Sequence, residues 1–321
     1  MSNLIKIKLP DSSIKEAQAG STIYDITGLI GKGLQKAALA AELDGVLTDL
    51  ATSVNKDSEL SIITFDSEKG RDIFWHSASH LMAQAVKRLY PDAKFAIGPS
   101  IESGFYYDID MKKTLTPEDL EAIEAEMAKI VEEKLDVKRE ETSKAEAIKY
   151  FSSINETYKI ELLNDLPDGT VSLYRQGEFA DLCRGPHLRN TEQIKAFKLL
   201  SIAGAYWRGD EKNRMLQRIY GVAFPDQKEL KKHLDFLEEV KKRDHRKIGK
   251  DLDLFSTHED VGAGLIYWHP KGARLRNTLE EWWKREHFKN GYDILYSPHI
   301  GRSTLWETSG HWQKYGAHNY S

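Results

Sequence analysis

The chain has 321 residues, 40% of them hydrophobic and 30% charged, which is typical of a globular protein and predicts two to four domains. Its net charge of −4 argues against a protein that coats nucleic acid, but leaves room for a local basic patch. No apolar run approaches the ~20 residues that span a bilayer, and the N-terminus lacks the apolar stretch of a secretory signal. The one cysteine cannot form an internal disulfide, so we expect a cytoplasmic protein that contacts no membrane.

Residues 1–65 predict a small domain in which strands surround one helix. The segment "LIKIKL" alternates apolar and polar residues as a strand does, and "ELSIITF" predicts the last strand of the domain. Between them, Thr22 and Asp25 have the spacing of a helix N-cap and its reciprocal partner. The order of strands and helix suggests a ubiquitin-like β-grasp domain, a kind of module that is often accessory.

Residues 66–225 predict a second domain that mixes helices and strands. A helix is expected over 71–90, with an apolar stripe on one face and His76 and His80 on the opposite face. Two capping boxes predict two further helices. From 169 to 224 the pattern becomes mostly strand-like.

A long helix with a basic end is expected over 226–250, where it would link two domains. Its last ten residues hold six Lys or Arg and one Asp, which fits either cations at a helix C-terminus or contact with RNA phosphates. From 251 a new domain begins, with a helix at "ARLRNTLEEWWKREHFKNG" and a strand at "YDILYSP". We expect residues 251–321 to be an incomplete domain.

The sequence contains two pairs of residues that can bind metals or move protons, and the two members of each pair stand four positions apart. His76 and His80 fall on one face of the predicted helix, whereas the proline between Cys183 and His187 predicts a loop. If the loop faces the helix, three imidazoles and a thiol meet, a set suited to tetrahedral zinc. The same set suits a hydrolytic pocket in which histidines orient or deprotonate water and Asp181 holds a polar substrate group.

Neither pair is decisive by itself. An HxxxH pair is common on protein surfaces, "HSASH" lacks the glutamate of zinc proteases, and a lone cysteine is often a buried apolar residue. A covalent role for Cys183 would need an activated thiolate, for which the sequence gives no sign. The presence of both pairs favours a functional site. The residues leave open whether that site binds zinc or hydrolyses a substrate.

Five segments, in this order, resemble bacterial threonyl-tRNA synthetases: "HSASHLMAQAV", "AIGPSIESGFYYDID", "FADLCRGPH", "FKLLSIAGAYWRGDEKNRMLQRIYG" and "KRDHRKIGKDLDLF". The likeness covers essentially the whole chain and implies a multidomain α+β protein. The implied domains are a β-grasp TGS domain at 1–65, an α/β editing domain at 66–225 that alanyl-tRNA synthetases share, a linker helix at 226–250, and the start of an antiparallel-sheet class II catalytic domain, including motif 1, at 251–321.

The resemblance also implies an editing site that hydrolyses Ser-tRNA(Thr). The residues implied to act are His76, His80, Asp181, Cys183 and His187. Lys159 and Tyr107 would line the pocket, which would receive the 3′-terminal adenosine of tRNA(Thr). Alanyl relatives bind zinc with the set of three histidines and one cysteine, whereas threonyl enzymes edit without a required metal, so the set permits zinc without requiring it.

Motifs 2 and 3 of class II synthetases and the zinc ligands of their threonyl catalytic core are missing from the sequence, so we expect the N-terminal part of a longer enzyme. The full-length parent would charge tRNA(Thr) with threonine, using ATP, Mg and one zinc whose ligands lie beyond residue 321, and would form a homodimer. The chain alone should edit but not charge. Two alternatives are a free-standing hydrolase that clears mischarged tRNA in trans, and a zinc-stabilised tRNA-binding module without turnover.

Overall fold

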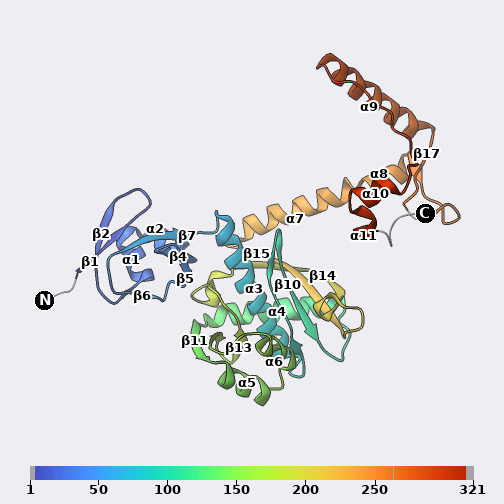
Figure 1. Ribbon diagram of the computed structural model, residues 1–321. Helices are drawn as coiled ribbons and strands as arrows, with labels where there is room; N and C mark the ends of the chain where they lie inside the picture. The colour runs from blue at the N-terminus through green and yellow to red at the C-terminus, as the bar shows by residue number, and fades with distance from the viewer. Residues whose placement is uncertain (1–3, 263, 316–321) are drawn as a thin grey trace. The chain divides into compact units, whose positions relative to one another are not determined.

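The computed structural model describes residues 4–262 and 264–315, and the chain divides into two compact units at 1–235 and 236–321 (Figure 1). The first unit contains a β-grasp part, which ends at Ile63, and a part of mixed helices and strands, which begins at Glu68. Within the described residues, no helix combines the length and the apolar character needed to cross a membrane.

The β-grasp part is a five-stranded sheet in the order β2-β1-β7-β4-β5, with β1 parallel to β7 and the other neighbours antiparallel. The strands are β1 (Leu4–Lys8), β2 (Ile14–Gln18), β4 (Ala40–Leu43), β5 (Val46–Thr48) and β7 (Ser58–Ile63), with a short ladder of β3 (Ser21–Thr22) and β6 (Ser53–Val54). Helices α1 (Ile23–Ile30) and α2 (Lys32–Ala37) lie between β3 and β4 in the chain. The Thr22 hydroxyl accepts the Asp25 N–H at 3.2 Å, which confirms the predicted N-cap. The strand order confirms the predicted β-grasp fold.

The mixed part contains two antiparallel sheets and a long central helix, α3 (Glu68–Leu89). One sheet has the order β14-β15-β10-β8 with β9 beside β10, and the other has the order β11-β12-β13. The first sheet's strands are β8 (Lys94–Phe95), β9 (Ser100–Ile101), β10 (Gly104–Asp110), β14 (Ala196–Tyr206) and β15 (Met215–Phe224). The second sheet and the remaining helices are β11 (Val137–Ser143), β12 (Thr170–Gln176), β13 (Phe179–Leu182), α4 (Pro117–Glu133), α5 (Lys144–Ser153), α6 (Thr157–Asn164), η1 (Thr191–Gln193) and η2 (Trp207–Gly209).

Helix α3 is more buried than the sequence predicted. The expected stripe is present, since Phe74, Leu81 and Met82 are almost fully buried, but the opposite face is also covered and His80 is only 4% exposed. The reason is that α3 contacts α4, β10 and β15 as well as β13, so its polar face meets the second sheet instead of solvent. The histidines therefore point into the protein, where a site can form.

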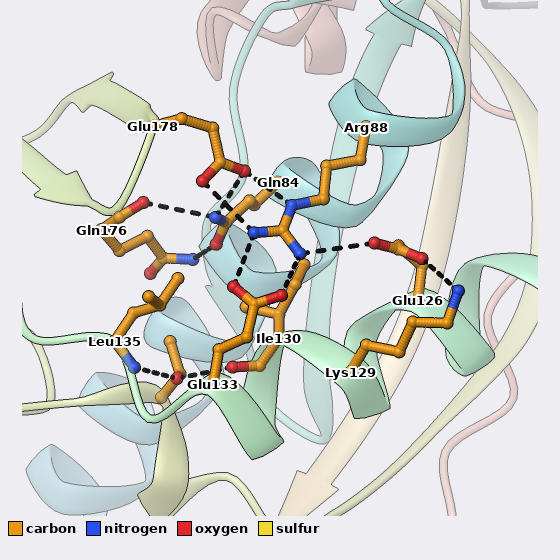
Figure 2. Close-up of polar contacts among 10 residues, drawn as sticks. Gln84, Arg88, Glu126, Lys129, Ile130, Glu133, Leu135, Gln176 and Glu178 are labelled. Atoms are coloured by element: carbon orange, nitrogen blue, oxygen red, sulfur yellow. Dashed lines mark hydrogen bonds and ion pairs between the residues drawn. The ribbon is translucent and has the colours of Figure 1, made fainter.

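Arg88, in the last turn of α3, joins three elements through carboxylates (Figure 2). Its guanidinium donates to Glu133 of α4 at 2.6 and 2.8 Å, and to Glu178 in the β12–β13 turn at 2.6 and 3.2 Å. Gln84, one turn earlier, donates to the Gln176 carbonyl at 3.3 Å, and its side-chain oxygen accepts from the Gln176 amide at 2.6 Å. These bonds hold the strand that leads to Asp181 against the helix that carries the histidines.

The helix expected over 226–250 is two helices, α7 (Gln227–Lys242) and α8 (His245–Asp251). The Asp226 carboxylate accepts the Glu229 N–H at 2.9 Å at the start of α7, as predicted. The prediction of one continuous helix was wrong because Asp244 begins a new one: its carboxylate accepts the Arg246 N–H at 2.8 Å, which is an N-cap.

The second unit has little sheet structure in the part that the structure describes. It contains β16 (Phe255–Ser256), β17 (Tyr267–Trp268), α9 (Pro270–Lys289), α10 (Thr304–Thr308) and α11 (His311–Tyr315). The helix predicted before residue 290 is present as α9, but the strand predicted at "YDILYSP" does not form and Leu295 is 90% exposed. A strand needs a pairing partner, and none of the described residues pairs with this segment.

Candidate active site

Helix α3 and the loop after β13 bring the two predicted pairs together. The Nε2 atom of His76 lies 3.0 Å from the Cys183 sulfur, and the Nε2 atom of His187 lies 3.1 Å from the same sulfur. The rings of His80 and His187 are 4.2 Å apart between centroids. One potential ligand atom from each of the four residues lies within 4.8 Å of the others, so a single small group can contact them all.

Neighbouring groups decide which nitrogen of two histidines carries the proton. The Nδ1 atom of His76 lies 2.8 Å from the Gly98 carbonyl, which can only accept, so Nδ1 donates. The Nδ1 atom of His187 lies 3.1 Å from the Ser77 hydroxyl, which already donates to the Ile73 carbonyl at 2.8 Å and therefore accepts here. Both histidines consequently direct the lone pair of Nε2 toward the sulfur.

Burial keeps these groups uncharged. It lowers the pKa of His76, and it lowers the pKa values of His80 and His187 well below 6.5, with neighbouring imidazoles acting in the same direction. Burial also raises the pKa of the Cys183 thiol to about 12. At neutral pH the site therefore offers neutral imidazoles that can accept a proton, and a thiol that keeps its own.

A charged group lies beside the histidines, although it is almost completely buried. Asp181 of β13 lies 2.5 Å from the Lys159 ammonium, and Tyr107 of β10 donates its hydroxyl to the other oxygen of Asp181 at 2.5 Å. Lys159 also donates to the Tyr107 oxygen at 2.9 Å, and His80 Nε2 lies 3.4 Å from the Asp181 carboxylate. Because Asp181 and Lys159 are 2% and 4% exposed, each charge depends on the other for compensation.

These residues line a cavity of about 920 Å³, a volume in the range of small-molecule sites. Ile97 and Leu162 contribute apolar surface to its lining, and His76, His80, Asp181 and Lys159 contribute polar groups. The exposed Arg139 and Arg184 also line it. The cavity can therefore hold a ligand that combines polar and apolar parts with a negative charge.

The four clustered residues fit a zinc ion by their chemistry. Three imidazoles and one thiol are a common tetrahedral donor set for Zn²⁺ once the thiol has lost its proton. The Nδ1 donors of His76 and His187 are already bound to Gly98 and Ser77, which is the outer arrangement that zinc-binding histidines use. Donor type and orientation thus permit a metal, as the sequence suggested.

Sequence reasoning missed Ser77 and Gly98, which fix the two imidazoles. Gly98 must be a glycine, because an added Cβ would lie 2.2 Å from the Tyr107 ring. Ser77 sits inside the predicted motif, and a hydroxyl directly after a histidine was an available signal. Lys159 and Tyr107 both line the cavity, but Lys159 is only 4% exposed, so the exposed cations of the lining are the two arginines.

Two family profiles match the chain. The TGS domain matches residues 5–64, and the "Threonyl and Alanyl tRNA synthetase second additional domain" matches residues 171–220, which include Asp181, Cys183 and His187. The chain is 58% identical over 316 residues to a threonine--tRNA ligase of Pelobacter propionicus, and 54% identical over 318 residues to that of Citrifermentans bemidjiense. These matches cover 98% and 99% of this chain and 50% of each relative, so the chain spans about half the length of the relatives it matches.

Proposed function

We propose that this chain, which belongs to the threonine--tRNA ligase family, performs editing: it hydrolyses the ester that joins serine to the 3′-terminal adenosine of tRNA(Thr). The observation that supports this most is the cluster of His76, His80, Cys183 and His187, three of which (His76, His80 and Cys183) line one cavity beside a buried carboxylate. The three imidazoles lie next to polar groups that can bind a seryl residue, which is what ester hydrolysis on an amino acid needs.

Editing is needed because serine differs from threonine by one missing methyl group. A charging site built for threonine cannot exclude the smaller serine, and the lost methyl is worth only about 1–3 kcal/mol, or roughly 10–200-fold. A second site can apply the opposite selection, because it can be too small for the threonine methyl. The polar end of the cavity, where His80 and Asp181 are almost fully buried, would be the place of this clash.

The reaction would begin with a water held by an imidazole. A neutral His76 or His187 accepts a proton from the water at Nε2 while the water oxygen attacks the ester carbonyl. The carbon–oxygen bond to the ribose then breaks, and the protonated imidazole returns its proton to the departing ribose oxygen. The products are serine and tRNA with a free hydroxyl, and the histidine ends neutral as it began.

Asp181 would bind a polar group of the seryl moiety. Lys159 forms an ion pair with the buried carboxylate, and Tyr107 fixes the orientation of that carboxylate through its hydroxyl. The exposed Arg139 and Arg184 would contact phosphates near the tRNA 3′ end, because guanidinium groups pair well with phosphate.

Cys183 would act through its position. Its thiol lies between the two Nε2 atoms and keeps its proton because burial raises its pKa to about 12, which disfavours attack by a thiolate. Hydrolysis by this route needs no metal. When zinc is bound, His76, His80, Cys183 and His187 would hold it, and it would supply a Lewis acid for the ester carbonyl.

The whole enzyme would do more than this chain. We infer that a protein with the full length of the relatives charges tRNA(Thr) with threonine in the cytoplasm, using ATP, Mg and a separate zinc, and that it is a homodimer. Because the donor set also fits zinc, a metal-stabilised tRNA-binding module without turnover is the second candidate. Metal content of the purified chain, measured together with its deacylation rate, separates the two.

The test is deacylation of Ser-tRNA(Thr) by the chain and by His76→Ala and Cys183→Ala. We expect both substitutions to abolish hydrolysis while filter binding of tRNA(Thr) is largely kept. His245→Ala is the matched control, because that histidine is exposed and lies outside the cavity. Hydrolysis at the wild-type rate by both site variants would refute the proposal.

A further inference from the structure

One carboxylate from the β-grasp part reaches the loop that carries Cys183 and His187. Asp49, directly after β5, accepts the backbone N–H of His187 with Oδ1 at 3.0 Å. Its other oxygen, Oδ2, accepts the hydroxyl of Tyr174 at 2.7 Å. Asp49 is separated from these partners by 138 and 125 positions in the chain, so the contact belongs to the tertiary fold.

Tyr174 of β12 supports the same loop with its ring. The ring centroid lies 4.4 Å from that of His187, and Tyr174 is only 2% exposed. Gly185 packs so closely that an added Cβ would lie 1.8 Å from the Tyr174 oxygen, and its φ of +69° suits glycine. By fixing the hydroxyl of Tyr174, Asp49 therefore also fixes the surface on which the loop rests.

The two ends of the loop are held by different parts of the chain. At the near end, β12 binds Cys183: the Cys183 N–H donates to the Ser172 carbonyl at 3.2 Å, and the Ser172 hydroxyl donates to the Cys183 carbonyl at 2.5 Å. At the far end, the His187 N–H has Asp49 as its acceptor. Ser172 of the mixed part thus holds the backbone of Cys183, whereas a side chain of the β-grasp part holds the backbone N–H of His187.

Contacts continue along the segment that follows. The Arg189 guanidinium lies 4.3 Å from the centroid of the Tyr24 ring, and the Gln193 side chain donates to the Ala38 carbonyl at 3.2 Å. Tyr24 and Ala38 both belong to the β-grasp part. Residues 187–193 are therefore docked on the β-grasp part, and Asp49 is the contact of this group that lies nearest to the imidazole.

We propose that Asp49 is a positioning residue of the editing site, and that the β-grasp part contributes to hydrolysis by holding His187 against Cys183. This inference rests on the proposed function. Asp49 does not line the cavity, so it acts on the reaction through His187 and Tyr174 and touches no substrate. The proposal gives the β-grasp part a definite task in deacylation.

The first test compares kcat and KM for Ser-tRNA(Thr) in Asp49→Ala. We expect kcat to fall about 10–100-fold, the usual effect of losing an outer support or of a shift near 1 Å, with KM changed less than about twofold. Asp49→Asn should recover most of kcat, because its amide oxygen can accept from His187 while its NH₂ donates to the Tyr174 oxygen. Asp57→Ala is the control: Asp57 accepts the Lys6 N–H within the β-grasp part and should leave kcat unchanged.

The second test needs no tRNA. Cys183 is the only cysteine, so its rate of alkylation by iodoacetamide reports directly on the loop. We expect Asp49→Ala to raise this rate at least about fivefold, because a loosened loop exposes the thiol, and Asp57→Ala to leave it unchanged. If the wild-type chain does not hydrolyse Ser-tRNA(Thr), the proposed function fails, and the alkylation rates alone then decide whether Asp49 holds the loop.

Tyr174→Phe is a second variant, in case Asp49→Ala loses activity only because it unfolds. It removes the hydroxyl that Asp49 accepts but keeps the ring beside His187, and near-UV circular dichroism shows whether the packing survives. We expect a kcat loss of about three- to tenfold, and little further loss when Tyr174→Phe is added to Asp49→Ala, since the shared bond is already gone. Wild-type kcat and wild-type alkylation rates in both folded variants would overturn the inference.

Discussion

Ser77→Ala removes the group that sets the tautomer of His187. The Ser77 oxygen accepts from His187 Nδ1 at 3.1 Å and from the Leu188 N–H at 3.0 Å, and it donates to the Ile73 carbonyl. Alanine leaves the buried Leu188 N–H without an acceptor, at a cost of about 1–3 kcal/mol, and removes the acceptor of the His187 N–H. We therefore expect a loss of about 1–3 kcal/mol in the free energy of unfolding, or roughly 2–12 °C in Tm for a unit of this size.

The same substitution should change the chemistry of the site. Without an acceptor at Nδ1, His187 can place its proton on Nε2, the nitrogen that faces Cys183. A protonated Nε2 cannot take a proton from water, so deacylation of Ser-tRNA(Thr) should fall about 10–100-fold. Nitrogen chemical shifts of the imidazoles, measured by NMR, report the tautomer independently of activity.

Ser79→Ala is the matched control for this experiment. Ser79 is on the same helix and is also buried, but its hydroxyl donates to carbonyl groups, and the Gly98 carbonyl still receives the His76 N–H after the change. No donor is left without a partner, so we expect a loss of less than about 1 kcal/mol. If Ser77→Ala and Ser79→Ala have the same Tm and the same deacylation rate, the reasoning about the tautomer is wrong.

Three further predictions concern charge. Burial lowers the pKa values of the site histidines, so the unfolded chain binds more protons than the folded chain below pH 6.5. The free energy of unfolding should therefore fall as the pH is lowered from 6.5 to 5, before most carboxylates titrate. Urea-unfolding curves that give the same free energy across that window would contradict the burial of neutral imidazoles. Arg88→Met should lower the free energy of unfolding by about 1–2 kcal/mol, since it removes a partly buried guanidinium that binds three carboxylates. The control Lys134→Met breaks one exposed ion pair and should cost less than about 0.5 kcal/mol in the same urea assay. Lys159→Met should cost about 3–5 kcal/mol at pH 7, because the buried Asp181 would lose its oppositely charged partner and keep only the Tyr107 hydroxyl. A Tm equal to that of Lys134→Met would show that this ion pair does not stabilise the fold.

Local signals in the sequence predicted several elements correctly. Thr22 and Asp25 form the cap that their spacing indicates, and the proline before His187 does place that residue on a loop. The i, i+4 spacing of His76 and His80 also puts both rings on one side of α3. Each of these inferences depends on residues within one helical turn, where geometry leaves few choices.

Features that depend on distant residues could not be predicted in this way. Nothing in "TYKIELL" shows that Lys159 meets Asp181, and only the family resemblance suggested that both line one pocket. Asp49 and Ser77 contact His187 across 138 and 110 positions, which no periodic pattern reveals. The break at Asp244 was a missed local signal, because aspartate is a common N-cap.

The expected strand near residue 295 failed for a related reason. Its apolar pattern is real, but a strand is stable only beside another strand, and the described residues offer it none.

The central claim is that one cavity hydrolyses the seryl ester and rejects the threonyl ester. Its most direct test is the initial deacylation rate of the 321-residue chain on Ser-tRNA(Thr) and on Thr-tRNA(Thr) at equal, subsaturating concentrations. We predict faster hydrolysis of the seryl ester by at least about tenfold, as expected when one methyl group clashes. Equal rates on the two esters, or no hydrolysis of either, would contradict the account.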